Sequence, residues 1–489
     1  NFNHKGKGDF SSEILDYASS TNIEKISASQ GLVTYLKDAA INLESKLNID
    51  QTQHKYTFKE NKLTLNKLGL LFNGFVQIPD STKTIMDVSF NAAQTDFKSL
   101  LSLIPAVYAK DFKDITAAGI LKLDGRMKGT MQGKSYPSFT LNLKVDNGKF
   151  QYPKLPSAVT DVFINAKINH EEGDLDKTVV NVSDFRINFA NEPISGHLNI
   201  ATPISDPNID LAAKGNINLA DIQKFYPIEN VQKLSGTAKV DLAVKAKKSD
   251  VEAKRYQNIQ AAGNINASNI EYASTDVPKP VSISSLQLNF SPQFVDIPQC
   301  KAAIGKSDFD IKGKLENVIG YALSKDAVVS GNVTILSNKI DANEFLPDST
   351  SAKKSTAQQA KEAFRIPKNI DLNGVATINE LLYDRLDIKN LQGKINLKNE
   401  QLTLNNLEAN LLGGSAIVSG FYNTKSDIPT GNLTYNIQNF DVQQVYEYIG
   451  SMKQAAPIMK YIHGIFNSNM NMQMAIHPDL SPDLNSLNG

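Results

Sequence analysis

The sequence predicts a mainly β protein: an elongated, twisted antiparallel sheet, curled into a groove from about four repeats, each with a short Asp-capped helix. Three features of the chain predict this fold: apolar and polar residues alternate over many segments, polar turn signals separate those segments, and a helix-start motif recurs. Successive side chains of a strand point to opposite faces, so each segment has one apolar and one wet face. Such strands are typical of antiparallel sheets that are solvated on one side.

Five segments carry the alternation most clearly. They run over residues 139–145, 185–189, 238–246, 286–290 and 470–476. Short polar or glycine-containing stretches are expected to be turns, because Gly and Asn tolerate the left-handed backbone of tight hairpins. These stretches are residues 146–148, 172–174, 399–400 and 413–414.

A helix-start motif recurs four times along the chain. It is an aspartate, an apolar residue, two variable residues and two further apolar residues, and it begins at Asp96, Asp221, Asp341 and Asp441. Aspartate is a preferred N-cap, and the apolar positions fall on one helical face. We expect a short helix at each motif, the first over about 96–112 and the last continuing to about residue 466.

The motif divides the chain into units of strands followed by a helix. The expected units are 1–112, 113–230, 231–347 and 362–489, the last including the start of a further unit, with a mobile polar loop at 348–361. The strand pattern repeats as well, since residues 62–68 match residues 401–407.

Composition bounds the function. The 51 basic and 51 acidic residues leave no basic excess for nucleic acid, and the single cysteine excludes a disulfide framework. The six histidines lack metal-ligand spacing, so they are expected at surface or turn positions. The sequence contains no run of 18 apolar residues, so it predicts no membrane-spanning helix. The first residue is Asn1 rather than Met, which favours a piece of a longer protein whose signal or anchor lies elsewhere.

Three local patterns could suggest catalysis, and each has a structural reading. Gly305-Lys306-Ser307 imitates the end of a phosphate loop, but its context alternates like strands and the first glycine of the motif is missing. Asp308 and Asp310 fit an exposed polar strand face. Cys300 fits a small packed residue. The sequence therefore predicts no enzyme, no cofactor and no metal.

The apolar side of a one-faced sheet must be covered or must bind something apolar. Two outcomes stay open at this point: a trough that accepts acyl chains, or a trough that closes into a dry core. The candidate lipid-lining residues are Leu121, Leu123, Phe139, Leu141, Leu143, Val145, Phe185, Ile187, Phe189, Val240, Leu242, Leu288 and Phe290.

The chain resembles the AsmA family of envelope proteins, especially AsmA-like proteins of Bacteroidota, which are related to TamB-type repeating β-groove proteins. The resemblance lies in the order of segments 104–112, 141–147, 202–207, 304–308, 313–317 and 455–458. It implies a periplasmic body anchored in the bacterial inner membrane through a segment absent here, and it implies no catalytic residues.

The family's implied role is binding or conducting phospholipid, or another acyl lipid, between inner and outer membrane, in support of outer-membrane homeostasis. An alternative role is a scaffold for outer-membrane protein assembly, which would offer an open sheet edge. An extracellular adhesin and a carbohydrate-active solenoid enzyme are further alternatives, disfavoured by the plain polar face and by the lack of a supported acid pair.

Overall fold

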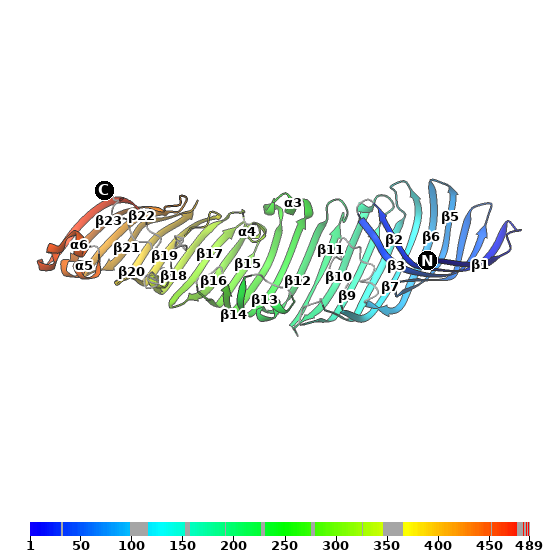
Figure 1. Ribbon diagram of the computed structural model, residues 1–489, viewed down its shortest axis with the longest axis horizontal. Helices are drawn as coiled ribbons and strands as arrows, with labels where there is room; N and C mark the ends of the chain where they lie inside the picture. Colours follow the sequence, from blue (N-terminus) through cyan, green and yellow to red (C-terminus); the bar gives the residue numbers. More distant parts are fainter. Residues whose placement is uncertain are drawn as a thin grey trace. The chain divides into compact units, whose positions relative to one another are not determined.

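The computed structural model describes residues 1–30, 33–97, 116–151, 157–190, 192–225, 230–274, 279–324, 326–345, 365–450 and 452–476, together with residues 483, 486 and 488. In this part of the chain 24 strands belong to one largely antiparallel sheet, accompanied by a few short helices (Figure 1). The mainly β class and the antiparallel pairing that the sequence predicts are confirmed.

The contacts divide the chain into two compact units. Unit 1 comprises Asn1–Ile228 and Lys239–Ala253, and unit 2 comprises Glu229–Ala238 and Lys254–Gly489. Strand β13 (Val231–Lys247) contributes residues to both. The division into four repeats stays a prediction, and the polar loop 348–361 lies outside the described residues.

Unit 1 is a meander in which each strand from β1 to β12 pairs antiparallel with the next. Its strands are β1 (Phe2–Gly8), β2 (Ile14–Gln30), β3 (Val33–Asp50), β4 (Lys55–Leu65), β5 (Leu68–Asp80), β6 (Lys83–Asp96), β7 (Thr116–Gln132), β8 (Ser138–Gln151), β9 (Val159–His170), β10 (Thr178–Phe189), β11 (Glu192–Ala201) and β12 (Asn208–Asn218). Its short helices are η1 (Leu175–Lys177), α2 (Leu219–Phe225) and α3 (Lys248–Glu252).

Unit 2 is also a meander, with one exception: β18 and β19 pair in parallel. A parallel pair needs a crossover connection, of which the structure describes residues 342–345 and 365–369. The strands are β14 (Gln260–Ser274), β15 (Val281–Phe290), β16 (Phe294–Ile304), β17 (Ser307–Glu316), β18 (Val329–Asp341), β19 (Ile370–Tyr383), β20 (Leu386–Lys398), β21 (Gln401–Leu411), β22 (Gly414–Asn423), β23 (Thr430–Asp441) and β24 (Ile465–Ala475). The short helices are η2 (Tyr256–Asn258), α4 (Val318–Leu323), η3 (Ala342–Phe345), α5 (Val442–Tyr448), α6 (Met452–Ala455) and η5 (Pro457–Tyr461).

Within each unit the pairings run from strand to neighbouring strand, so the described sheet does not close on itself. The solvent-accessible surface of the chain is 29103 Å². A compact monomer of 53.6 kDa exposes roughly 18,000 Å². So large a surface is what a sheet with little covering material exposes.

The recurring aspartates have different local roles. Asp441 is the N-cap of α5, where its carboxylate accepts from the amide of Gln444 at 2.8 Å. Asp341 likewise accepts from Asn343 N at 3.2 Å before the single turn of η3. Asp221, however, lies inside the first turn of α2, and Asn218 Oδ1 accepts from Ala220 N at the start of that helix. The expectation of an Asp221 cap is therefore wrong.

The two helices that were expected to be long have different outcomes: the first lies mostly outside the described residues, and the last is interrupted. At the first motif, Phe97 is helical and buried, and residues 98–115 lie outside the described residues. The last motif does not continue as one helix to residue 466. Helix α5 ends at Tyr448, Pro457 starts the separate turn η5, and Phe466 belongs to β24.

Four β-bulges, two in each unit, have the same kind of backbone-to-side-chain hydrogen bond. In each, the second bulge residue has a positive φ, and its backbone N–H donates to a side chain on the neighbouring strand. The side-chain acceptor replaces the ladder hydrogen bond that the extra residue disrupts, and Asn and Asp tolerate the left-handed backbone. The donor–acceptor pairs are Asp38–Ser27 at 3.0 Å, Glu60–Asn73 at 2.8 Å, Asn406–Ser419 at 2.9 Å and Asn439–Asn467 at 2.8 Å.

The predicted turns are confirmed except for one. Asn399 and Glu400, both with positive φ, join β20 to β21, and Gly413 lies between β21 and β22. Asn147 instead lies within β8, where the register against β9 shifts between Val145 and Gly148. Asparagine tolerates the left-handed backbone both in hairpin turns and in bulges. Here β9 stays paired with β8 on both sides of Asn147, so Asn147 lies in a bulge.

Candidate functional site

Nine of the thirteen candidate lining residues share one face of unit 1. Directly opposite residues on paired strands project to the same side of a sheet. The pairings align apolar residues in rows that cross the strands, and one row crosses eight strands from β5 to β12. It consists of Phe72, Phe90, Gly125, Leu141, Ile168, Val180, Ile200 and Ile209.

A second row joins candidates from β7, β8 and β10, and a bulge makes this possible. The row is Leu121, Val145, Ile164, Phe185, Gly196 and Ala213. In β10 the apolar positions change from even numbers, at Val180 and Val182, to odd numbers from Phe185 onward. The register shift after Val182 keeps both sets on the same face.

The candidates in unit 1 differ in burial. Leu121 and Val145 are 0% exposed and, with Leu123, belong to a hydrophobic cluster that includes Phe97. Leu141, Leu143, Ile187 and Phe189 are partly buried against this cluster. The three buried residues are therefore core positions, and the half-buried ones are those available to contact a ligand. Val240 and Leu242 of β13 are half-buried as well.

His170 is a polar interruption of this face that the sequence did not identify. It was expected at a surface or turn, but it is 3% exposed at the end of β9. Its ring stacks on Phe139 at 5.0 Å and its Nδ1 lies 3.1 Å from Thr178 Oγ1. His4, His54, His197 and His463 are exposed as expected, and His477 lies outside the described residues.

Unit 2 has an equally continuous apolar face, which we call the unit 2 apolar face. One row crosses nine strands from β16 to β24, and most of its members are half-buried. This row is Ile297, Gly313, Val333, Gly374, Ile395, Leu404, Gly420, Leu433 and Met472. Apart from the β24 methionines, these residues are not among those singled out from the sequence. Their alternation with a period of two was enough to predict that they lie on an apolar strand face.

The two remaining candidates, Leu288 and Phe290, lie on β15 in unit 2. Leu288 faces Ile265, and Phe290 faces Val295. Phe290 begins a further row on the same face. That row continues through Val295, Leu315, Gly331, Leu372, Leu397, Leu402, Tyr422, Gly431 and Met474.

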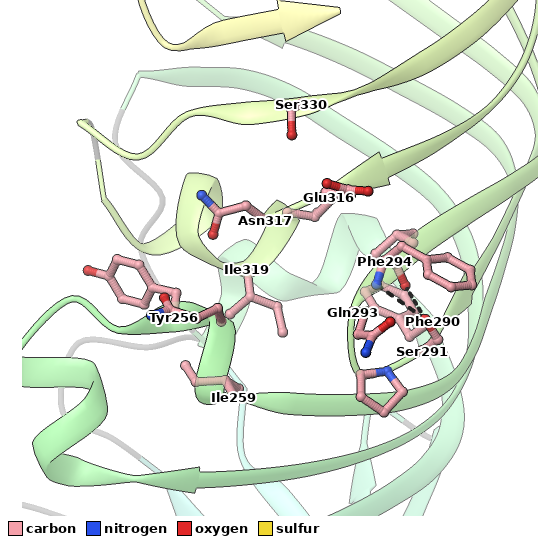
Figure 2. Close-up of a pocket in the computed structure, with 14 residues that line it drawn as sticks. Tyr256, Ile259, Phe290, Ser291, Gln293, Phe294, Glu316, Asn317, Ile319 and Ser330 are labelled. Carbon is pink, nitrogen blue, oxygen red and sulfur yellow. Dashed lines mark hydrogen bonds between the residues drawn. The ribbon is translucent and has the colours of Figure 1, made fainter.

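A cavity of about 320 Å³ lies at the Phe290 end of this row. Figure 2 shows Ile259 and Ile319 on one side of it and Phe290, Ser291 and Gln293 on the other. Ser291 and Phe294 close the β15–β16 turn, where Ser291 Oγ donates to Phe294 O at 2.9 Å. The volume is at the lower end for a ligand pocket, so the cavity would hold only a small group or one end of an apolar chain.

Short helices cover the other end of the unit 2 apolar face. Val445 of α5 packs in a cluster with Phe440, Ala416 and Leu412. Met459 of η5 packs against the same cluster. This helical covering is local, and the middle of the long rows remains half-buried rather than buried.

The opposite face carries ion pairs. Arg126 on β7 makes two hydrogen bonds of 2.7 Å to the Asp87 carboxylate on β6. Those bonds lower the pKa of Asp87. In unit 2, hydrogen bonds from Lys389 and then Lys339 lower the pKa of Glu380. Exposed pairs of this kind contribute little stability each and leave this face solvated.

The patterns that imitate catalytic sites have structural roles. Gly305-Lys306 forms the β16–β17 turn, and the Lys306 amide donates to Glu344 Oε2 at 2.6 Å. Asp308 accepts from the backbone amide of Lys339 at 2.7 Å. Burial, followed by Asp310, raises the pKa of the Cys300 thiol, which lowers its thiolate fraction. Within the described residues, no group of three or more His, Cys, Asp or Glu is placed to hold a metal ion.

The fold and these two faces define a class: a mainly β protein with half-buried apolar sheet faces as its candidate binding surfaces. Comparison with protein-family models, with curated proteins and with solved structures finds no match. Among the described helices, none has the length and apolar character needed to span a bilayer.

Proposed function

We propose that the apolar sheet faces bind the acyl chains of phospholipid, and that the protein serves lipid movement between the inner and outer membranes of a bacterial envelope. One observation carries this proposal: the rows of the unit 2 apolar face cross up to ten strands, yet most of their members are only half-buried. Apolar surface that stays in water costs about 25 cal/mol per Å², so a surface of this extent favours an apolar occupant.

The composition of the face supports acyl chains over other apolar ligands. Ile, Leu, Val and Met dominate it, and glycines such as Gly313, Gly374 and Gly420 recur within one row. Flexible aliphatic chains adapt to an aliphatic surface without specific polar contacts. Curling of the twisted sheet around such chains, as a groove, is part of this proposal, as is a periplasmic location with an inner-membrane anchor.

The test is direct uptake of lipid. Protein stripped of lipid should bind a phospholipid that carries a fluorophore on one acyl chain, with saturation at a fixed number of lipids per protein. Native mass spectrometry of protein purified from a bacterial envelope should show acyl lipid. Stripped protein that takes up no labelled phospholipid would exclude the proposal.

A second function, scaffolding of outer-membrane protein assembly, is favoured by one observation. Every residue of strand β1 is exposed, and within the described residues β1 pairs with β2 on one side. An exposed strand edge can accept another strand. Crosslinks from β1 to barrel-assembly proteins, without lipid uptake by the sheet faces, would establish this function in place of the first.

A further inference from the structure

The helical segment after β23 exposes a concentrated group of large apolar side chains. We call residues 442–465, which comprise α5, α6, η5 and the start of β24, the helical cap. Within it, Tyr461 is 76% exposed and both Ile458 and Ile465 are 66% exposed. Tyr448 and Ile462 are exposed as well. A surface group of this density needs an explanation, because singly scattered apolar residues are ordinary but clusters mark interaction sites.

The geometry of η5 places the two principal residues together. Side chains three positions apart eclipse in a 3₁₀-helix, so Ile458 and Tyr461 project in the same direction. Met459, between them, packs inward against the cluster of Phe440 and Val445. The amphipathic division of this short turn is therefore fixed by packing.

Hydrogen bonds hold η5 against α5. The side-chain amide of Gln443 on α5 donates to the carbonyl oxygens of Met459 and Ile462. Ile465 pairs with Asp441, which is the N-cap residue of α5. These contacts hold in place the backbone segments that bear the exposed apolar side chains.

The cap has a small positive excess. Residues 442–465 contain Lys453, Lys460 and a single acidic residue, Glu447, whereas the whole chain has a formal net charge of zero. Lys460 Nζ lies 5.7 Å from the centroid of the Tyr461 ring, and Lys453 Nζ lies 5.8 Å from that of Tyr446. Both ammonium groups therefore lie beside aromatic rings at the apolar surface.

We propose that the helical cap docks on the surface of a lipid bilayer that contains anionic headgroups. Tyrosine prefers the boundary between headgroups and acyl chains, isoleucine inserts beyond it, and lysine contacts anionic headgroups. Each lysine near such a surface strengthens binding roughly fivefold. A protein partner would require matching carboxylates, whereas an anionic bilayer supplies both the apolar layer and the negative charge.

Docking has a consequence for unit 2. Phe440 and Phe466, which lie beneath the cap, pack beside Val418 and Ile437 at one end of the unit 2 apolar face. A docked cap brings this end of the face to the bilayer. The proposal is independent of acyl binding by the sheet, because a cap that docks while the sheet takes up no lipid upholds this inference and overturns the earlier one.

The test is co-flotation of the full chain with vesicles of phosphatidylcholine alone or with one quarter phosphatidylglycerol. We expect about fivefold stronger binding to the anionic vesicles, weakened by salt, because one glutamate offsets one of the two lysines. The double variant Ile458→Ser/Tyr461→Ser should lower binding at least tenfold. The double variant Lys453→Gln/Lys460→Gln should lower binding to anionic vesicles alone.

A matched control is Ile428→Ser, because Ile428 is 67% exposed in the loop before β23, at the opposite end of that strand from the cap. It should leave vesicle binding unchanged. Equal binding by wild type and the Ile458→Ser/Tyr461→Ser variant would overturn the proposal. So would a wild-type dimer, detected by light scattering, that dissociates in this variant while vesicle binding is absent, because a second copy would then occupy the cap.

Discussion

Replacing Ile395 by asparagine should weaken acyl-lipid binding by the unit 2 apolar face. Ile395 lies in the row that crosses nine strands, between Gly374 and Leu404. Its side chain leans over Gly374, since a Cβ on that glycine would lie 2.6 Å from Ile395 Cγ1. Ile395 therefore packs over Gly374 while part of its side chain stays exposed.

The magnitude follows from this half-burial. Full burial of an isoleucine contributes about 1.5–3 kcal/mol. At most roughly a third of Ile395 is exposed, so covering it contributes about 0.5–1 kcal/mol to binding. An asparagine amide covered by an acyl chain adds a penalty of about 1 kcal/mol for its lost hydrogen bonds to water. The sum, about 1.5–2 kcal/mol, is roughly a 10- to 30-fold loss of affinity.

Folding should survive the change. The lost packing against Gly374 and Leu404 costs about 1 kcal/mol, and domains of ordinary stability tolerate such a loss. The matched control is Ile417→Asn, since Ile417 is 43% exposed on the opposite face of β22, between Glu408 and Asn436. Its affinity for lipid should change less than twofold.

The assay is titration of lipid-free protein with a fluorescent phospholipid below its aggregation concentration, with circular dichroism as the check on folding. If Ile395→Asn and Ile417→Asn lowered affinity equally, or if neither lowered it, the assignment of the ligand to this face would be refuted.

Three further predictions concern stability and are measured by denaturant unfolding. Ser419→Ala removes the acceptor for the Asn406 amide and should lower the free energy of unfolding by about 0.5–1.5 kcal/mol. The control Ser415→Ala, at an exposed position of the same strand, should change the free energy of unfolding by less than about 0.5 kcal/mol. Equal effects would contradict the bulge-capping role. Asp441→Ala should cost about 1 kcal/mol through loss of the α5 N-cap and Asp441→Asn should restore most of it; a failure of asparagine to restore stability would count against capping. Glu380→Gln should destabilise the protein at pH 7 but not at pH 3: the pKa of Glu380 is lowered by its lysine partners, so the stabilisation is present above the ordinary carboxyl pKa and is lost as pH falls through the lowered value. A difference that persisted unchanged at pH 3 would show that the pairing is not its source.

Alternation in the sequence was enough to predict strands with one apolar face. The residues at 139–145 and 286–290 lie in β8 and β15 as expected, because the period of two is a local property of an extended chain. The Asp441 cap was also predictable, since the carboxylate and the amides it accepts from are within one turn.

An apolar sheet face was predictable from the sequence, but which of its residues are buried and which are half-buried was not. Leu121 and Val145 belong to a buried cluster, while Leu141 on the same face is only half-buried. No local pattern distinguishes them, because burial depends on tertiary packing, here the packing of Phe97 in one cluster with Leu121 and Val145. His170 was missed for the same reason: its burial comes from Phe139 and Thr178 on the two adjacent strands.

One pair of matching segments separates what the chain determines by itself from what the tertiary structure decides. Residues 62–68 and 401–407 share their pattern, and each contains an asparagine with a positive φ: Asn66 at the fifth position of its segment and Asn406 at the sixth. In the first copy, Asn66 begins the turn between β4 and β5; in the second, β21 continues past Asn406 as a bulge opposite Ser419. The extended segments and their apolar face follow from the local alternation of the sequence. Only the tertiary structure decided between turn and bulge, because that choice depends on which strand lies alongside and supplies hydrogen bonds to the continuing backbone.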